Sequence, residues 1–204
     1  MSSNAEIRAR ARELLGGGIL KNEWLYAMLI SLAVTLITGA LSATGIGTLI
    51  VSGLLMAATA NYFTARIRGR AGYDSLGALV DGATKDLAGN IITGILHSVF
   101  IILWSLLFVI PGIVKSCSYA LTFYIKNDRP ELSATEAITE SRRMMEGYKM
   151  QYFLLQLSFI GWYIVGILCL GIGAFWVSAY VEAANAHFYE EVKMAKAPFF
   201  NVLP

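Results

Sequence analysis

Long apolar runs separated by short charged segments dominate the pattern of this chain. The runs pair up across short turns without charge, and stretches rich in Lys, Arg, Asp and Glu separate the pairs. Apolar runs of about 20 residues match the length needed to cross a bilayer as a helix. The pattern predicts an all-α polytopic membrane protein, with six transmembrane helices arranged as three hairpins plus amphipathic helices on the cytoplasmic side. The predicted segments are an interfacial helix in 1–23, hairpin 1 in 24–67, a second interfacial helix in 72–89, hairpin 2 in 90–127, a cytoplasmic helix in 133–147, hairpin 3 in 149–190 and a tail in 191–204.

The second hairpin decides the topology, because Pro111-Gly112 interrupts its apolar stretch. This pair either kinks one long helix or reverses the chain. A kink would separate the charged segment 126–149 from the arginines at 66, 68 and 70, whereas a reversal keeps them on one side. The positive-inside rule favours the reversal. The returning helix, predicted over 113–125, is then only about 20 Å long, so it borrows part of the next turn or sits in a thinned bilayer.

Three amphipathic segments lie outside the hairpins. Ser3 with Glu6, and Ser133 with Glu136, have the spacing of helix capping boxes. The first helix is expected on the membrane surface, with its arginines toward anionic headgroups. The second, from Asp74 to Leu87, is too polar to span and is expected in the cytoplasmic interface.

Composition supports a membrane location. The 204-residue chain is 56% hydrophobic and only 15% charged, with a mean hydropathy of +0.60, far more apolar than a soluble domain. Of its sixteen Lys and Arg residues, the predicted topology leaves only Lys115 off the cytoplasmic side. We expect a multi-pass membrane protein with both termini in the cytoplasm. No cleavable leader is expected, and Cys117 and Cys169 are expected to be buried free thiols.

An internal repeat links the first and last hairpins. Residues 45–63 align without gaps on residues 171–189, sharing a Gly-Ile-Gly turn and several buried-type alanines. This predicts a parallel duplication of a helical hairpin. The small-residue face of the second helix is interpreted as tight packing within the monomer rather than a dimer seam, and a homo-oligomer stays open.

The second half of the chain contains a distinctive set of short motifs, which are Ile110-Pro111-Gly112-Ile113 with Lys115, Ser118-Tyr119, Glu136-Ala137-Ile138 with Ser141, Met144-Met145 and Gly147, Leu157 to Trp162, Gly171-Ile172-Gly173 and Phe188-Tyr189. With these motifs it strongly resembles the bacterial integral membrane family catalogued as domain of unknown function 975, and the first half resembles that family weakly. The resemblance implies a multi-spanning bacterial protein without catalytic residues. It implies no activity, because the family has none established.

Glu182 is the sharpest candidate for chemistry, since a carboxylate about 13 Å into a membrane is normally paired, protonated or turned toward a polar cavity. It is either a proton- or cation-responsive site, with Asn185 and Asn61 nearby, or a structural hydrogen bond to a neighbouring helix. Lys115 is expected to extend toward the outer headgroups or to contact a lipid phosphate, with an ion pair to Glu182 as the alternative. A hydrated or lipid-filled cavity lined by Lys115, Tyr119, Asn61 and Glu182 would indicate a transporter.

The sequence contains no nucleophile elbow, phosphate loop, metal-ligand spacing or paired carboxylates, so no enzyme, cofactor or metal is predicted. No cationic block argues for nucleic acid. The first hypothesis is a non-catalytic membrane module that binds lipids or a partner protein, with Ile138, Ser141 and Met145 as the partner-binding face. The alternative is a small solute transporter or permeation pathway that uses Glu182.

Overall fold

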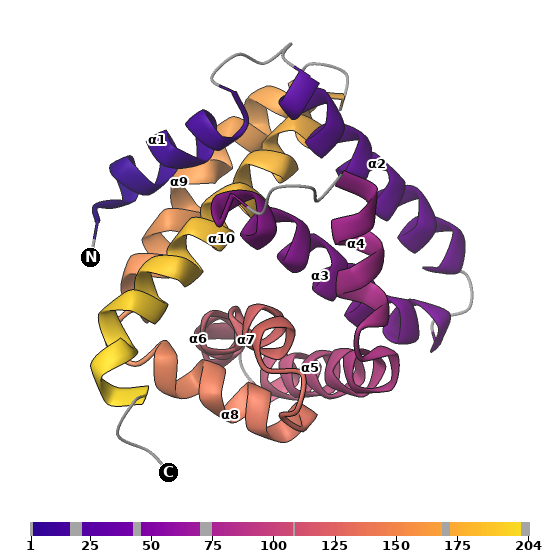
Figure 1. The fold of residues 1–204 in the computed structure, drawn as a ribbon, viewed down its shortest axis with the longest axis vertical. Coiled ribbons are helices and arrows are strands. Elements are labelled where there is room, and N and C mark those ends of the chain that lie inside the picture. Colours follow the sequence, from indigo (N-terminus) through magenta and orange to yellow (C-terminus); the bar gives the residue numbers. More distant parts are fainter. Residues whose placement is uncertain are drawn as a thin grey trace.

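The computed structural model describes residues 2–16, 22–42, 46–69, 75–107, 109–168 and 172–200, and this part of the chain folds into helices without a strand (Figure 1). The predicted all-α class is therefore confirmed. The helices are α1 (Asn4–Leu14), α2 (Asn22–Ser42), α3 (Ile46–Ile67), α4 (Ser75–Thr84), α5 (Leu87–Leu107), α6 (Val109–Tyr119), α7 (Thr122–Asp128), α8 (Ala134–Met144), α9 (Lys149–Leu168) and α10 (Ile172–Phe200).

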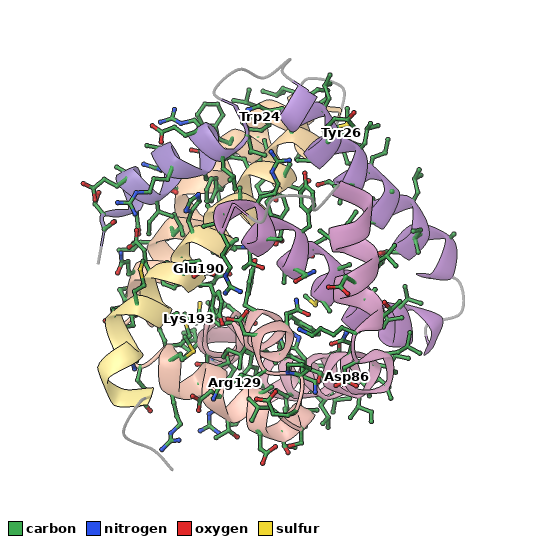
Figure 2. The ribbon with its side chains drawn as sticks, in the orientation of Figure 1. Trp24, Tyr26, Asp86, Arg129, Glu190 and Lys193 are labelled. Atoms are coloured by element: carbon green, nitrogen blue, oxygen red, sulfur yellow. The ribbon has the colours of Figure 1, made fainter. Side chains whose placement is uncertain are left out.

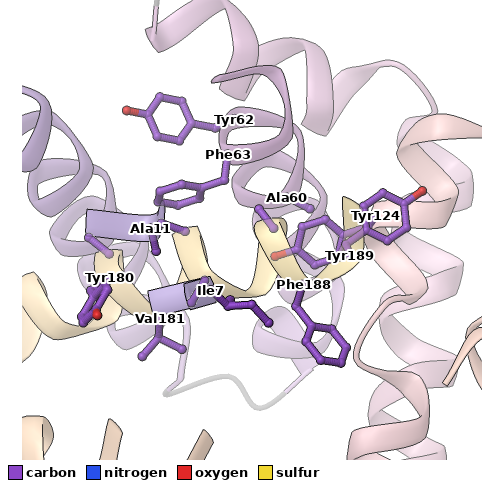
Figure 3. Close-up of a cluster of buried hydrophobic side chains, with 14 of the residues drawn as sticks. Ile7, Ala11, Ala60, Tyr62, Phe63, Tyr124, Tyr180, Val181, Phe188 and Tyr189 are labelled. Carbon is purple, nitrogen blue, oxygen red and sulfur yellow. The ribbon is translucent and has the colours of Figure 1, made fainter. Parts of the chain in front are cut away.

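Helices α3 and α10 form the centre of the fold. α3 packs against α4, α5, α7 and α10, and α10 packs against α1, α2 and α9. Figure 3 shows the aromatic and aliphatic side chains that meet where α1, α3, α7 and α10 converge. The core therefore lies where the three predicted hairpins meet, which is the arrangement that buries one face of each.

The chain does reverse after α5, as predicted. The ring of Phe100 lies 6.2 Å from that of Tyr119, and the ammonium of Lys115 lies 4.3 Å from the ring of Trp104, so α5 and α6 run antiparallel. However, Pro111-Gly112 is not at the tip. It lies in the first turn of α6, where the missing N–H of proline costs no helical hydrogen bond.

The prediction of one returning helix over 113–125 is wrong. The helix ends at Tyr119 and a new one begins at Thr122. At this break Ser141 of α8 replaces helical hydrogen bonding: its hydroxyl donates to the carbonyl of Ser118 over 2.8 Å and accepts from the backbone N–H of Leu121 over 3.2 Å.

Both predicted capping boxes are confirmed, at Ser3 with Glu6 and at Ser133 with Glu136. The expected placement of the first helix differs. α1 buries Ile7, Ala11 and Leu15 against the protein and lies along α10 (Figure 1), so its apolar face is not available to a membrane.

The end of the chain is also more ordered than the sequence suggested. Helix α10 continues to Phe200, whereas a tail was expected from residue 191. The predicted cap Asp74, the arginine at 70, the second cysteine at 169 and the Gly45 and Gly171 turn residues lie outside the described residues.

The internal repeat appears in the structure as two equivalent helices. α3 begins at Ile46 and α10 at Ile172, which are matched positions in the alignment. The alanines shared by the two copies are buried in both: Ala57, Ala58 and Ala60 in α3, and Ala183, Ala184 and Ala186 in α10. A side chain at Gly53 would lie 2.1 Å from the carbonyl oxygen of Asn90 and 2.9 Å from the Cα of Gly94. The small-residue face thus packs within the monomer, as interpreted from the sequence.

Two helices of the described part, Leu87–Leu106 and Lys149–Leu168, are long and apolar enough by length and composition to cross a membrane, and Trp24–Ala40 is a shorter apolar helix. Only 22% and 17% of the two most apolar windows are buried within the protein. These helices therefore present most of their apolar side chains outward.

Candidate functional site

Glu182 lies on α10 and faces α7. Its Oε2 accepts a hydrogen bond from the hydroxyl of Tyr124 over 3.4 Å, and its side chain is partly exposed. Tyr124 is itself buried and stacks on Tyr189, with 5.2 Å between the ring centroids. One long hydrogen bond satisfies little of a carboxylate's acceptor capacity. Glu182 is thus held by a neighbouring helix without being enclosed.

Asn185 follows one turn later on α10 and pairs with α9. Its Oδ1 accepts a hydrogen bond from the Nε2 of Gln156 over 2.7 Å. Tyr152 hydrogen-bonds to Gln156, and Tyr152 and Tyr163 lie within electrostatic range of Glu182. Tyr124 of α7 therefore bonds to Glu182 directly, and tyrosines of α9 lie within electrostatic range of it. Sequence reasoning missed Tyr124 and Gln156. Gln156 could have been noticed, because it is a polar residue within the apolar run of α9.

The other predicted site residues lie elsewhere. Asn61 donates to the carbonyl of Ala78 over 2.8 Å and so fixes α4 on α3. Tyr119 is buried against the rings of His97 and Phe100. Lys115 lies on Trp104 of α5. Among the described residues, the contacts of Lys115, Tyr119 and Asn61 are to residues other than Glu182, so these contacts do not support the shared cavity that would indicate a transporter.

The predicted topology placed Lys115 on the opposite side of the membrane from the other cations, but the structure does not separate them. Lys115 lies within electrostatic range of Arg142 and Lys149. The reason is the break between α6 and α7, which lets α8 dock through Ser141 one turn from Lys115.

The predicted partner-binding face is buried. Ile138, Ser141 and Met145 are at most 3% exposed, because α8 packs this side onto α5 and the α6–α7 break. A partner cannot reach these side chains in the folded protein, so the assignment is wrong. The amphipathic pattern was detected correctly, but its apolar side faces the chain itself.

The strongest polar cluster, which the sequence did not reveal, joins α3, α7 and α10. Arg68 donates to both carboxylate oxygens of Asp128, over 2.7 and 2.8 Å, and to Glu190 over 2.8 Å. The hydroxyl of Tyr189 donates to Asp128 over 2.8 Å, and Lys193 also pairs with it. Glu190 and Lys193 lie where α10 approaches α7 (Figure 2). We call these five residues the Asp128 cluster.

The charges of this cluster stabilise one another. Burial alone would raise the pKa of Asp128, but hydrogen bonds from Arg68, Lys193 and Tyr189 outweigh burial and hold that pKa well below its ordinary value of 3.8. The hydrogen bond to Asp128 likewise raises the pKa of Arg68. Asp128 and Arg68 are therefore both ionised at neutral pH, and the residues of the cluster are saturated by one another rather than open to a ligand.

A second ion pair anchors the start of α5. Lys126 is only 3% exposed, pairs with Asp86 over 2.6 Å, and donates to the carbonyls of Pro130 and Leu132. The hydrogen bond from Lys126 lowers the pKa of Asp86. Because its buried ammonium has three acceptors, Lys126 has a structural role and holds the segment before α5 against α7 and the loop that follows α7. No group of three or more His, Cys, Asp or Glu side chains suited to a metal occurs among the described residues.

A family model described as a protein of unknown function (DUF975) matches residues 49–196, which is most of the chain. The chain belongs to the DUF975 family. No curated protein matches this DUF975 chain, and neither does any solved structure. The match confirms the resemblance seen in the sequence, which was strong in the second half and weak in the first.

The region shared with the DUF975 family model contains the Asp128 cluster, Lys126 with Asp86, and Glu182 with Tyr124. It leaves out α1 and α2. The polar contacts that join α3, α7 and α10 of this DUF975 protein thus fall within the part matched by the family model, whereas those that seat α1 on α10 lie partly outside it.

Proposed function

We propose that this DUF975 protein is a non-catalytic integral membrane module of the bacterial plasma membrane that binds membrane lipid. The observation that carries the proposal is the exposure of large apolar side chains at the hairpin ends. Leu106, Ile110 and Leu168 are 83%, 76% and 78% exposed. Moving one such side chain out of water is favourable by about 1.5–3 kcal/mol of free energy. This free energy is gained if the side chain lies in the hydrocarbon of a membrane.

The distribution of charge supports the same proposal. The described parts of α2 beyond Trp24, α3 before Ala65 and α9 after Met150 contain no formally charged side chain. The charged clusters gather at the opposite ends of these helices, around Arg68, Asp128 and Glu190. In this proposal the three hairpins enter from the cytoplasm, and their uncharged ends point away from it.

The second hairpin enters at a slant in this proposal. α6 has eleven residues, so it is only about 16 Å long, and Lys115 on it lies within electrostatic range of Lys149 at the start of α9. Because Lys149 is cytoplasmic in the proposed topology, the hairpin returns before reaching the opposite surface. A chain that turns back within the membrane is tolerated where its backbone is packed against protein.

Cysteine labelling in intact cells tests the topology. Starting from a chain with Cys117 and Cys169 replaced by Ala, single cysteines are introduced as Ala40→Cys, Leu168→Cys and Arg142→Cys. A membrane-impermeant maleimide should label the first two in intact cells and Arg142→Cys only after permeabilisation. Labelling of Leu168→Cys and Arg142→Cys from the same side, or release of the protein by alkaline carbonate, would overturn the proposal.

A permeation pathway that uses Glu182 is the second candidate. The observation that favours it is that Glu182 is partly exposed and held by only one long hydrogen bond, from Tyr124. A carboxylate that is costly to keep in a membrane is retained most readily where it carries a proton or a cation.

Proteoliposomes loaded with a pH-sensitive dye test this candidate. A proton leak driven by a potassium diffusion potential should be lost in Glu182→Gln and kept in Asn61→Ala, whose side chain contacts α4 instead. Equal fluxes in the parent and Glu182→Gln proteins would leave Glu182 as a structural hydrogen-bond acceptor.

A further inference from the structure

Three cations from different helices converge on one side of the second hairpin. Lys115 comes from α6, Arg142 from α8 and Lys149 from the first residue of α9. Helix α6 packs against both α8 and α9. The hydroxyl of Ser141, next to Arg142, donates to the carbonyl of Ser118, one turn beyond Lys115. Lys115 lies within electrostatic range of both other cations.

Several other cations in the described part of the chain pair with a carboxylate. Arg68 and Lys193 pair with Asp128, Lys126 with Asp86, and Arg10 with Glu191. Lys115, Arg142 and Lys149 make no ion pair with any described residue, and the charges that act on Lys115 are both positive. Three like charges held together by packing repel one another unless an anion lies among them.

We propose that Lys115, Arg142 and Lys149 form a binding site for the phosphate of an anionic phospholipid headgroup. Basic pockets between membrane helices on the cytoplasmic side bind such headgroups. The N-terminus of α9, where Lys149 stands, adds favourable helix-dipole charge. Trp104, which lies against Lys115 over 4.3 Å, is a residue type suited to the headgroup region. This inference rests on the proposed membrane location and names the lipid class.

Native mass spectrometry of the full chain, released from uncharged detergent micelles, tests the site. Phosphatidylglycerol and phosphatidylcholine are titrated separately into the parent, into the triple variant Lys115→Gln/Arg142→Gln/Lys149→Gln, and into the charge-matched control Arg8→Gln/Arg12→Gln/Lys85→Gln. The site variant should bind phosphatidylglycerol about 100-fold more weakly, at about fivefold for each cation. The control should stay within about threefold of the parent.

A competition arm distinguishes the two sources of phosphate. If millimolar inorganic phosphate fails to displace phosphatidylglycerol, the ligand is the lipid headgroup. If it displaces the lipid in the parent, the same three cations bind soluble phosphate, and the assignment to lipid is overturned. Equal phosphatidylglycerol affinity in the site variant and the control, or equal affinity of the parent for the two lipids, overturns the site itself. Release of the parent protein by alkaline carbonate would refute the membrane location separately.

Discussion

Replacing Asp128 with Asn removes the one negative charge that α3, α7 and α10 share. In the parent, Arg68 from α3 donates to both oxygens of this carboxylate, and Tyr189 and Lys193 from α10 contact it as well. The amide of Asn keeps one acceptor oxygen but places an NH₂ group against donors. The variant therefore breaks the contact that joins the three hairpins while changing the volume of the side chain very little.

The expected loss of stability is about 3 kcal/mol. Breaking a buried ion pair costs about 3–5 kcal/mol. The Asp128 and Arg68 side chains are 16% and 23% exposed, and Glu190 still pairs with Arg68 in the variant, so about 2–3 kcal/mol applies to this pair. Lys193 is 45% exposed, which limits its contribution to about 0.5 kcal/mol.

Thermal unfolding in detergent, followed by tryptophan fluorescence, measures this loss. For a chain of this size each kcal/mol lowers the Tm by about 2–4 °C, so Asp128→Asn should unfold about 6–12 °C below the parent at pH 7. Glu190→Gln is the matched control, since it leaves the Arg68–Asp128 pair intact, and it should cost about 1 kcal/mol. A double-mutant cycle with Arg68→Gln isolates the pair.

The pH dependence gives a second check. The pKa of Asp128 is lowered in the folded protein, so its stabilisation is complete above its ordinary pKa of 3.8 and is lost as the pH falls through the folded value. The Tm difference between parent and Asp128→Asn should be constant from about pH 8 to 5 and narrow below about pH 4. A difference under about 2 °C at pH 7, or one equally large at pH 3, would refute the reasoning.

Two further substitutions test helix packing. Gly53→Ala should lower the Tm by about 5 °C or more, because the added Cβ would lie 2.1 Å from the carbonyl oxygen of Asn90. The control Gly39→Ala, which has open space around it, should leave the Tm unchanged or raise it slightly. Equal Tm changes in the two variants would show that α3 and α5 are not in close contact. Ser141→Ala should lower the free energy of unfolding by about 1–3 kcal/mol, since it leaves the carbonyl of Ser118 and the N–H of Leu121 unpaired. Thr139→Ala, at an exposed position of the same helix, is the control in the same melting assay. Equal melting points of the two variants would contradict the docking of α8.

The sequence predicted those elements whose signals are local. The capping boxes at Ser3 and Ser133 each depend on residues three positions apart, and both appear where expected. The reversal after α5 followed from charge asymmetry and was also correct. In contrast, the break after Tyr119 depends on Ser141, which is more than twenty residues away, and no local pattern predicts it.

The candidate site was predicted only in part, for the same physical reason. Glu182 was noticed because a charge in an apolar run is conspicuous, but its partner Tyr124 comes from another helix. Arg68, Asp128 and Glu190 each looked like an ordinary charge at a helix end. Their contact depends on how α3, α7 and α10 cross, and helix crossing is set by packing along whole faces rather than by the spacing of a few residues.

Helix α1 has an unusual position in the order of synthesis. Arg10 and the backbone N–H of Ser2 both bind Glu191, and the hydroxyl of Tyr180 donates to the carbonyl of Arg8. Both partner residues, Glu191 and Tyr180, lie on α10, which is synthesised after α2 to α9. Helix α1 can therefore be seated only once α10 has been made, and a protein truncated before α10 would leave Ile7, Ala11 and Leu15 without the surface that covers them.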